Sequence, residues 1–222
     1  MFQSIANIIV TYKEGMLSGL LVTLELVGIV WLVGISVGVC LGAYAHHVKA
    51  AGKSLKVLWF LISSIPLLVL LFWLHFPLQE LLGVVIQPFI TAAAALSIVN
   101  IVFVASIIKD ALDEFPEQYT IAGRVNGLEE KEIFMKIQLP LICRAVIPQL
   151  LFLQVAMLQA TIFASLISVE EVFRVSQRIN SVIYKPIEIY TTLALFFIII
   201  CLPINLLASW YKNKYTRNLS ER

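Results

Sequence analysis

The sequence predicts an all-α membrane protein with five transmembrane helices, on the basis of its composition, its charge-free stretches and the placement of its basic residues. Of the 222 residues, 60% are hydrophobic and 14% are charged, and the mean hydropathy is +0.92. A soluble domain is about 45–50% apolar and about 25% charged, so an aqueous fold of this length cannot bury so much apolar surface. The composition excludes a soluble enzyme and a disordered regulator. The net charge of only +2 also argues against a nucleic-acid-binding protein.

Five stretches without Asp, Glu, Lys or Arg are long enough to cross a bilayer. About 20 helical residues span the ~30 Å hydrocarbon layer, and a helix satisfies its own backbone hydrogen bonds there. Glu25 is taken inside the first span, Pro88 starts the third, and we expect Pro66 and Pro203 to kink the second and fifth. We therefore expect a single transmembrane domain over residues 1–222, with spans at 19–45, 57–77, 88–108, 146–168 and 189–211.

The basic residues predict the orientation of these spans. If the spans alternate in direction, 12 of the 16 Lys and Arg residues lie on one side, in the linkers 46–56 and 109–145 and after residue 211. Basic residues concentrate in the cytoplasmic loops of membrane proteins. We therefore expect the N-terminus outside and the C-terminus in the cytoplasm.

The linker 109–145 is the only sizeable soluble segment, and it holds seven acidic and five basic residues. It is rich in helix formers, and Pro140 and Pro148 bracket its end, so we expect a helix to stop near Leu139. From composition alone, this cytoplasmic segment is either a solvated connector or a docking surface for a soluble partner.

Two prolines and a glycine in this linker carry a family resemblance, and that resemblance favours the docking surface. Pro116 stands eleven residues before Gly127, and the Leu139-Pro140 pair places a proline thirteen residues after it. This pattern resembles the EAA loop of ABC-importer permeases, in particular the polar amino-acid (histidine/glutamine/arginine-type) permease family. The resemblance extends to Gly-Leu-Leu-Val-Thr-Leu at residues 19–24 and to Thr161, Ser165, Ile167 and Glu171 near the other end.

The sequence also departs from that family. The Glu of the EAA motif is replaced by Ile121, and the Arg-Gly-Thr-Pro of the second span becomes Ser-Ser-Ile-Pro at residues 63–66. The Glu often found in the third span is Ser106. These departures leave the solute class and the details of docking open.

The resemblance implies a type I ABC importer permease fold. In such an importer two permease subunits, the same or homologous, form the pathway in the bacterial cytoplasmic (inner) membrane. Two cytoplasmic ATPases hold ATP and Mg, and an external solute-binding protein delivers the solute. This chain would then be a transport subunit and not an enzyme, with no cofactor of its own and the linker 109–145 as its coupling loop. The residues expected to couple it to the ATPase are Ala122, Gly123, Arg124, Gly127, Glu130, Leu139 and Pro140.

Polar residues inside the spans are candidates for the solute pathway. They are Glu25, Ser97, Asn100, Gln154, Thr161 and Ser165. An intramembrane carboxylate faces protein or a water-filled cavity, so Glu25 is expected to contact solute or the partner permease, or else to lie at the interface. The others either line a pathway or form hydrogen bonds between helices.

The first span also carries a ridge of glycines. Gly34, Gly38 and Gly42 lie on one helical face and let another helix approach closely. No metal site is predicted, because the adjacent His46 and His47 lack Cys or acidic partners at ligand spacing.

These observations favour the permease of an amino-acid ABC importer. The alternatives are an ABC permease for another small solute, a non-transporting membrane scaffold and a small intramembrane enzyme. The ordered linker argues against the scaffold, and the absence of a nucleophile–base pair argues against the enzyme.

Overall fold

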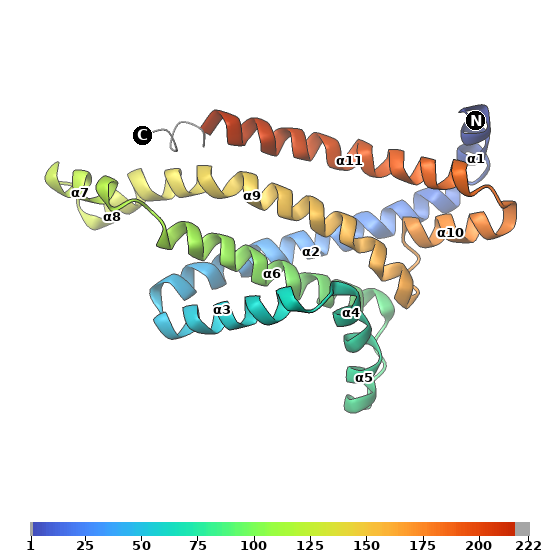
Figure 1. Cartoon of the computed structure of the whole chain (residues 1–222), viewed down its shortest axis with the longest axis horizontal. Helices are drawn as coiled ribbons and strands as arrows, with labels where there is room; N and C mark the ends of the chain where they lie inside the picture. Colours follow the sequence, from blue (N-terminus) through green and yellow to red (C-terminus); the bar gives the residue numbers. More distant parts are fainter. Residues whose placement is uncertain (1, 216–222) are drawn as a thin grey trace.

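The computed structural model describes residues 2–215, and every regular element in that range is helical. The long helices run side by side in an elongated bundle (Figure 1). The helices long and apolar enough to cross a membrane are α2 (Lys13–His47), α6 (Pro88–Asp113), the helical run Glu130–Ile167 and α11 (Pro186–Tyr215). A fifth span exists if α3 (Lys49–Ser64) and the bent segment Leu67–Leu82 are counted together. The predicted all-α membrane fold with up to five spans is confirmed.

Helices α2 and α6 form the centre of the bundle. Leu26 and Val30 of α2 are fully buried in one apolar cluster with Leu96 of α6. Farther along α2, the predicted ridge of Gly34, Gly38 and Gly42 faces α6. A Cβ atom added at Gly38 would lie 2.6 Å from Val104 Cβ, which is closer than atoms approach in real structures. The missing side chains therefore let the two helices lie in direct backbone contact.

The predicted kink at Pro66 is a full break in the chain direction. α3 ends at Ser64, and the segment Leu67–Leu82, which begins with α4 (Leu67–His75), lies at an angle of 95° to it. Ile65 has the extended backbone (φ −97°, ψ 122°) that a residue before proline prefers. The stretch predicted as the second span, residues 57–77, is therefore two helices with a bend between them. By contrast, α11 runs without interruption through Pro203.

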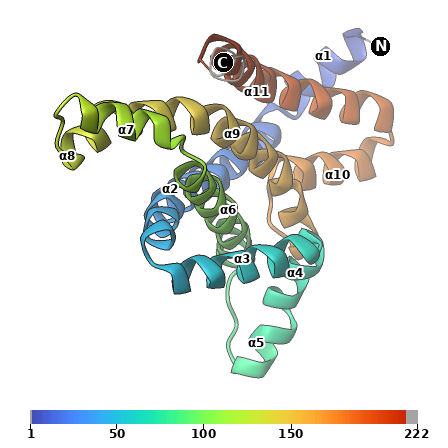
Figure 2. The same cartoon turned by 60° about the vertical axis from the view of Figure 1, so that its left-hand side comes forward.

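The segment after α4 projects away from the bundle. α5 (Pro77–Leu82) points outward and the chain returns from it to α6 (Figure 2). The buried Gln79 side chain holds this return in place, because it accepts a hydrogen bond from the Ile86 N–H at 2.8 Å and donates one to Thr91 Oγ1 at 3.1 Å. α6 then begins at Pro88, a residue that suits the first turn of a helix.

The linker after α6 differs from the expected helix that ends near Leu139. It forms α7 (Glu117–Val125), a turn and α8 (Glu130–Ile133), which continues through a π-helical turn (Phe134–Gln138) directly into α9 (Leu139–Ala160). The Leu139 N–H donates to the Phe134 carbonyl, five residues back. Pro140 lies in the first turn of α9. The π turn just before this proline lets the helical run continue past it. The expected stop was therefore wrong.

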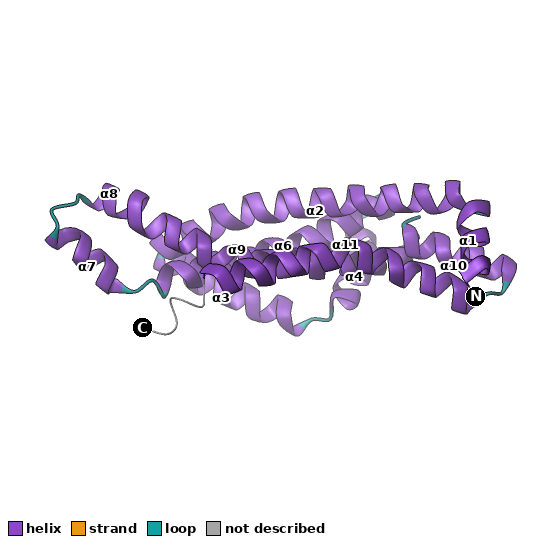
Figure 3. Ribbon diagram, turned by 90° about the horizontal axis from the view of Figure 1, so that it is seen from above, coloured by secondary structure: helices purple, strands orange, loops and turns teal. Residues whose placement is uncertain are grey.

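The remaining elements close the opposite end of the molecule. α9 tightens into a 3₁₀ turn (Thr161–Ile167), and α10 (Val172–Ile183) leads to α11, with α1 (Phe2–Thr11) beside them. The buried Glu171 carboxylate caps α10 by accepting hydrogen bonds from the N–H groups of Phe173 and Arg174, at 2.9 and 2.8 Å. Figure 3 shows α7 and α8 at one end of the bundle and α1 and α10 at the other.

Candidate functional site

The α7–α8 segment is shaped by a tight turn at Gly127. This residue has φ +77°, in the left-handed region that favours glycine. Its N–H donates to the Arg124 carbonyl at 3.0 Å, and the Leu128 N–H donates to the Gly123 carbonyl at 3.1 Å. These two bonds form the Schellman ending of a helix. Gly127 thus ends α7 and turns the chain back toward α8.

Close packing fixes α7 against the helix that follows the turn. A Cβ atom added at Gly123 would lie 2.8 Å from Ile133 Cγ1, and Ile133 itself is buried. The Gln138 side chain donates to Thr120 Oγ1 at 3.2 Å. The segment is therefore a small two-helix unit with an apolar contact of its own.

Charged side chains surround this unit. The Arg124 guanidinium contacts the Glu130 carboxylate at 2.6 Å across the turn. Glu129 and Glu132 form a capping box at the start of α8, and Lys136 contacts Glu132 at 2.6 Å. These pairs are largely exposed, so each adds little stability. They orient the turn and leave a polar rim around it.

The outward face of α7 is apolar and exposed. Ile121 is 54% exposed and Val125 is 81% exposed, with the exposed Ala122 between them. The spacing i, i+1 and i+4 places the three side chains on one side of the helix. Gly123 faces the other way, onto Ile133. Two of the predicted coupling residues, Leu139 and Pro140, lie apart from this face, at the start of α9.

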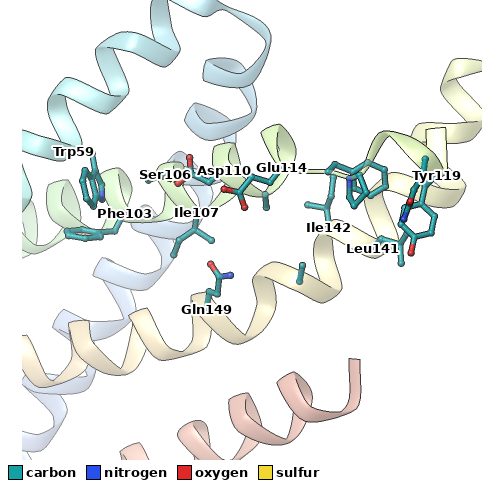
Figure 4. A pocket seen from close by; sticks show the side chains of 15 residues that line it. Trp59, Phe103, Ser106, Ile107, Asp110, Glu114, Tyr119, Leu141, Ile142 and Gln149 are labelled. Atoms are coloured by element: carbon teal, nitrogen blue, oxygen red, sulfur yellow. Dashed lines mark hydrogen bonds between the residues drawn. The ribbon is translucent and has the colours of Figure 1, made fainter. Parts of the chain in front are cut away.

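A cavity of about 540 Å³ adjoins the α7–α8 segment along α6 (Figure 4). Trp59 and Phe103 form one end of it, and Tyr119 and Leu141 lie toward the other. The polar side chains along its length are Ser106, Asp110, Glu114, Gln118 and Gln149. The cavity thus joins an aromatic wall to two carboxylates at the end of α6. It can hold a small molecule that carries both an apolar and a cationic group.

Two of the predicted pathway residues bind each other in the bundle core. The Asn100 amide donates to Gln154 Oε1 at 2.9 Å, and the Gln154 amide donates back to Asn100 Oδ1 at 3.1 Å. Asn100 also lies 3.0 Å from the Val30 carbonyl, and the Trp31 indole donates to the Gln154 carbonyl at 3.1 Å. Both amide side chains are buried. This network links α2, α6 and α9. The two side chains therefore form hydrogen bonds between helices, which is the second of the two roles that the sequence left open.

The other pathway candidates do not converge with these two. Ser97 is buried on α6, and Thr161 and Ser165 are buried in the 3₁₀ turn, where each hydroxyl donates to a carbonyl three residues back. Glu25 lies on the exposed side of α2 and points away from this chain's core. None of the six lines the cavity beside α6.

The structure adds functional candidates that the sequence reasoning missed. Asp110 and Glu114 follow Ser106 at successive helical turns, a spacing that would have marked an acidic face on α6. Near them, the buried Lys109 pairs with Asp113, which also contacts His46 of α2 at 2.7 Å. That pairing joins residues 67 positions apart, so no local pattern could show it. Within residues 2–215, no three His, Cys, Asp or Glu side chains gather as a metal site.

A bundle of several helices long and apolar enough to cross a membrane, with a short two-helix unit at one end, defines a multi-pass membrane protein. Residues 34–218 match the family model described as "Binding-protein-dependent transport system inner membrane component". The chain belongs to this family. It is therefore an inner-membrane transport component and not an enzyme.

Individual relatives and a solved structure extend the comparison. The chain is 26% identical over 163 residues to the probable glutamine ABC transporter permease protein GlnP of Bacillus subtilis (strain 168), covering 73% of this chain and 74% of that protein. It is 25% identical over 214 residues to the glutamate/aspartate import permease protein GltK of Escherichia coli O6:H1, covering 90% and 92%. The structure of an amino acid ABC transporter with histidines superposes with a TM-score of 0.82 at 23% identity, covering 93% of this chain and 96% of that chain. That structure shows the same fold.

Proposed function

We propose that this chain is the permease subunit of an ATP-binding-cassette importer that moves amino acids across the bacterial cytoplasmic membrane. The observation that carries the proposal is the exposed apolar face of Ile121, Ala122 and Val125, held rigidly at one end of a membrane bundle. An exposed apolar surface with a polar rim is typical of a protein-binding site. In a transport system of this family, the partner that fits it is the ATPase.

The route from this face into the membrane is a single helical run. α8 begins at Glu130, and the helix continues through the π turn and α9 to Ile167. α7 is fixed to that run by the close contact of Gly123 with Ile133. A rigid-body movement of the bound ATPase therefore tilts α9 directly.

In the proposed assembly, partner subunits supply ATP hydrolysis and deliver the solute. Two ATPase subunits bind ATP and Mg and dock on the α7 faces of two permeases, either identical or homologous. An external solute-binding protein delivers the solute at the opposite end. Glu25, exposed on α2, is assigned to contact with the second permease or with the solute.

The orientation follows from the charge distribution. We place α7 and α8 in the cytoplasm, because most of the basic residues lie on that side. α10 lies at the other end of the bundle (Figure 1), where the binding protein would dock. The N-terminus is then outside and the C-terminus inside.

The cavity beside α6 is assigned to the solute route. Asp110 and Glu114 provide carboxylates that accept hydrogen bonds from the ammonium group that amino acids share. Trp59 and Phe103 provide an aromatic wall for apolar or cationic side chains. The relatives named for glutamine and for glutamate/aspartate support amino acids as the solute class.

Co-purification of the ATPase tests the docking face. Val125→Asp places a charge in the apolar face and should abolish recovery of the co-expressed ATPase with the tagged permease. The matched control is Val182→Asp, since Val182 is 67% exposed on α10 at the other end of the molecule. Equal recovery with both variants would show that α7 is not the docking site.

A further inference from the structure

One face of α11 is a continuous apolar stripe that ends at a lysine. Leu195, Ile199, Leu202, Leu206 and Trp210 recur every three or four residues and are 44% to 69% exposed. At 1.5 Å per residue the stripe from Leu195 to Trp210 is about 22 Å long. One leaflet of hydrocarbon is about half of the ~30 Å layer. The stripe is therefore long enough to lie along one lipid tail.

Basic and aromatic side chains gather where the stripe ends. The Lys214 ammonium lies 4.7 Å from the centre of the Trp210 ring and 5.3 Å from that of Tyr215. Arg144 of α9 reaches the same Tyr215 ring, with its Cζ 5.5 Å from the centre. Tyr211 packs on Tyr215, with ring centres 4.6 Å apart. Two helices thus place two cations around one aromatic platform.

Among the residues that the structure describes, no carboxylate pairs with the charges of this cluster. Elsewhere Lys109, Arg124, Lys136, Arg174 and Arg178 all contact Asp or Glu. Among residues 2–215, no carboxylate oxygen lies within 4.0 Å of the charged nitrogens of Arg144 or Lys214. Cations stacked on exposed aromatic rings remain free to bind an anion.

We propose that the ends of α9 and α11 form a binding site for the headgroup of an anionic phospholipid. The phosphodiester lies between Arg144 and Lys214, Trp210 and Tyr215 border it, and one acyl chain runs along the α11 stripe. A free anion would use the two cations but not the stripe. A neutral lipid would use the stripe but not the cations. The combination fits an amphipathic anion.

Lipid titration followed by native mass spectrometry tests this site on the full-length chain. Phosphatidylglycerol and phosphatidylcholine with the same acyl chains are the probes, and only the first should bind tightly. Each basic group near an anionic surface changes binding by about fivefold. Arg144→Gln/Lys214→Gln should therefore weaken phosphatidylglycerol binding by about twentyfold and leave phosphatidylcholine binding unchanged.

The control variant also removes two positive charges from the end of the molecule that we place in the cytoplasm. Lys53→Gln/Lys56→Gln alters two exposed lysines of α3 that have no aromatic platform, and it should retain wild-type binding. Tyr215→Leu should weaken binding of the anionic lipid while both cations remain. Thermal unfolding without lipid checks that all variants fold.

Four results would overturn the proposal. The first is equal binding of the two lipids by the wild type, and the second is an equal loss in the lysine control. The third is full competition by inorganic phosphate, which would indicate an anion site without a lipid. The fourth is loss of lipid binding when the ATPase or a second permease is bound, which would assign the surface to that protein.

Discussion

At the scale of single residues, the glycines act in two different ways. Gly34, Gly38, Gly42 and Gly123 are needed because another helix occupies the space of their side chains. Gly127 has open space around it, and its role is the positive φ of the turn. The two roles predict different responses to substitution.

Gly38→Ala should destabilise the bundle because its Cβ atom meets Val104 and α6. Overpacking of this kind costs about 1–3 kcal/mol. Gly28→Ala on the same helix is the control, since a Cβ atom there has nothing within 4 Å. Thermal unfolding in detergent should show a lower midpoint for the first variant only. Equal midpoints would contradict the close α2–α6 contact.

Gly127→Val should disturb the turn, and Gly127→Asn should preserve it. A β-branched residue is strained at φ +77°, by about 1–2 kcal/mol, whereas Asn tolerates the left-handed region. Recovery of the co-expressed ATPase is the measurement, with reduced recovery expected only for valine. If both variants bind the ATPase like the wild type, the shape of this turn does not matter for docking.

The Asn100–Gln154 pair should behave as a coupled unit. Gln154→Leu leaves the buried Oδ1 atom of Asn100 without its hydrogen-bond donor, at a cost of about 1–3 kcal/mol. Asn100→Leu/Gln154→Leu removes both amides and should recover part of that stability. A double-mutant cycle by thermal unfolding measures the coupling. Additive losses would mean that the two side chains do not depend on each other.

At the scale of elements, prolines explain which boundaries the sequence could show. Pro88 begins α6 and Pro66 breaks the second span, because proline acts on its own backbone and on the residue before it. Pro140 misled the prediction, since the π turn before it lets α8 continue into α9. In the π turn the Leu139 N–H bonds to a carbonyl five residues back and not four. The order of residues gives no sign of that change.

The cap of α10 is an element with a predicted pH response. Burial raises the pKa of Glu171 to about 7 from its ordinary value of 4.5. The folded chain therefore holds this proton more tightly than the unfolded chain, and protonation stabilises the fold. This contribution is complete below about pH 4.5 and is lost as the pH rises through about 7.

Unfolding of the wild type and of Glu171→Gln, measured between pH 5 and 8, checks this response. The wild type should lose stability relative to the variant across that range, because Gln keeps one of the two cap acceptors and does not titrate. A parallel pH dependence of the two proteins would show that Glu171 does not titrate there.

At the scale of the whole molecule, the sequence predicted the class of fold better than the site. Charge-free stretches and the spacing of Pro116 and Gly127 are local features, so they revealed the membrane helices and the linker between two of them. The cavity beside α6, the Lys109–Asp113–His46 cluster and the Arg144–Tyr215 contact join distant segments. Their assembly depends on how the helices pack, which no single stretch encodes.

The central claim is that this chain, driven by an ATPase bound to α7, moves amino acids through the membrane. The most direct test is uptake of radiolabelled amino acids by vesicles that contain the permease–ATPase complex, with ATP inside and the solute-binding protein outside. We predict ATP-dependent uptake by the wild type and none by Val125→Asp. An intact complex that hydrolyses ATP without moving any amino acid, or undiminished uptake by Val125→Asp, would contradict this account.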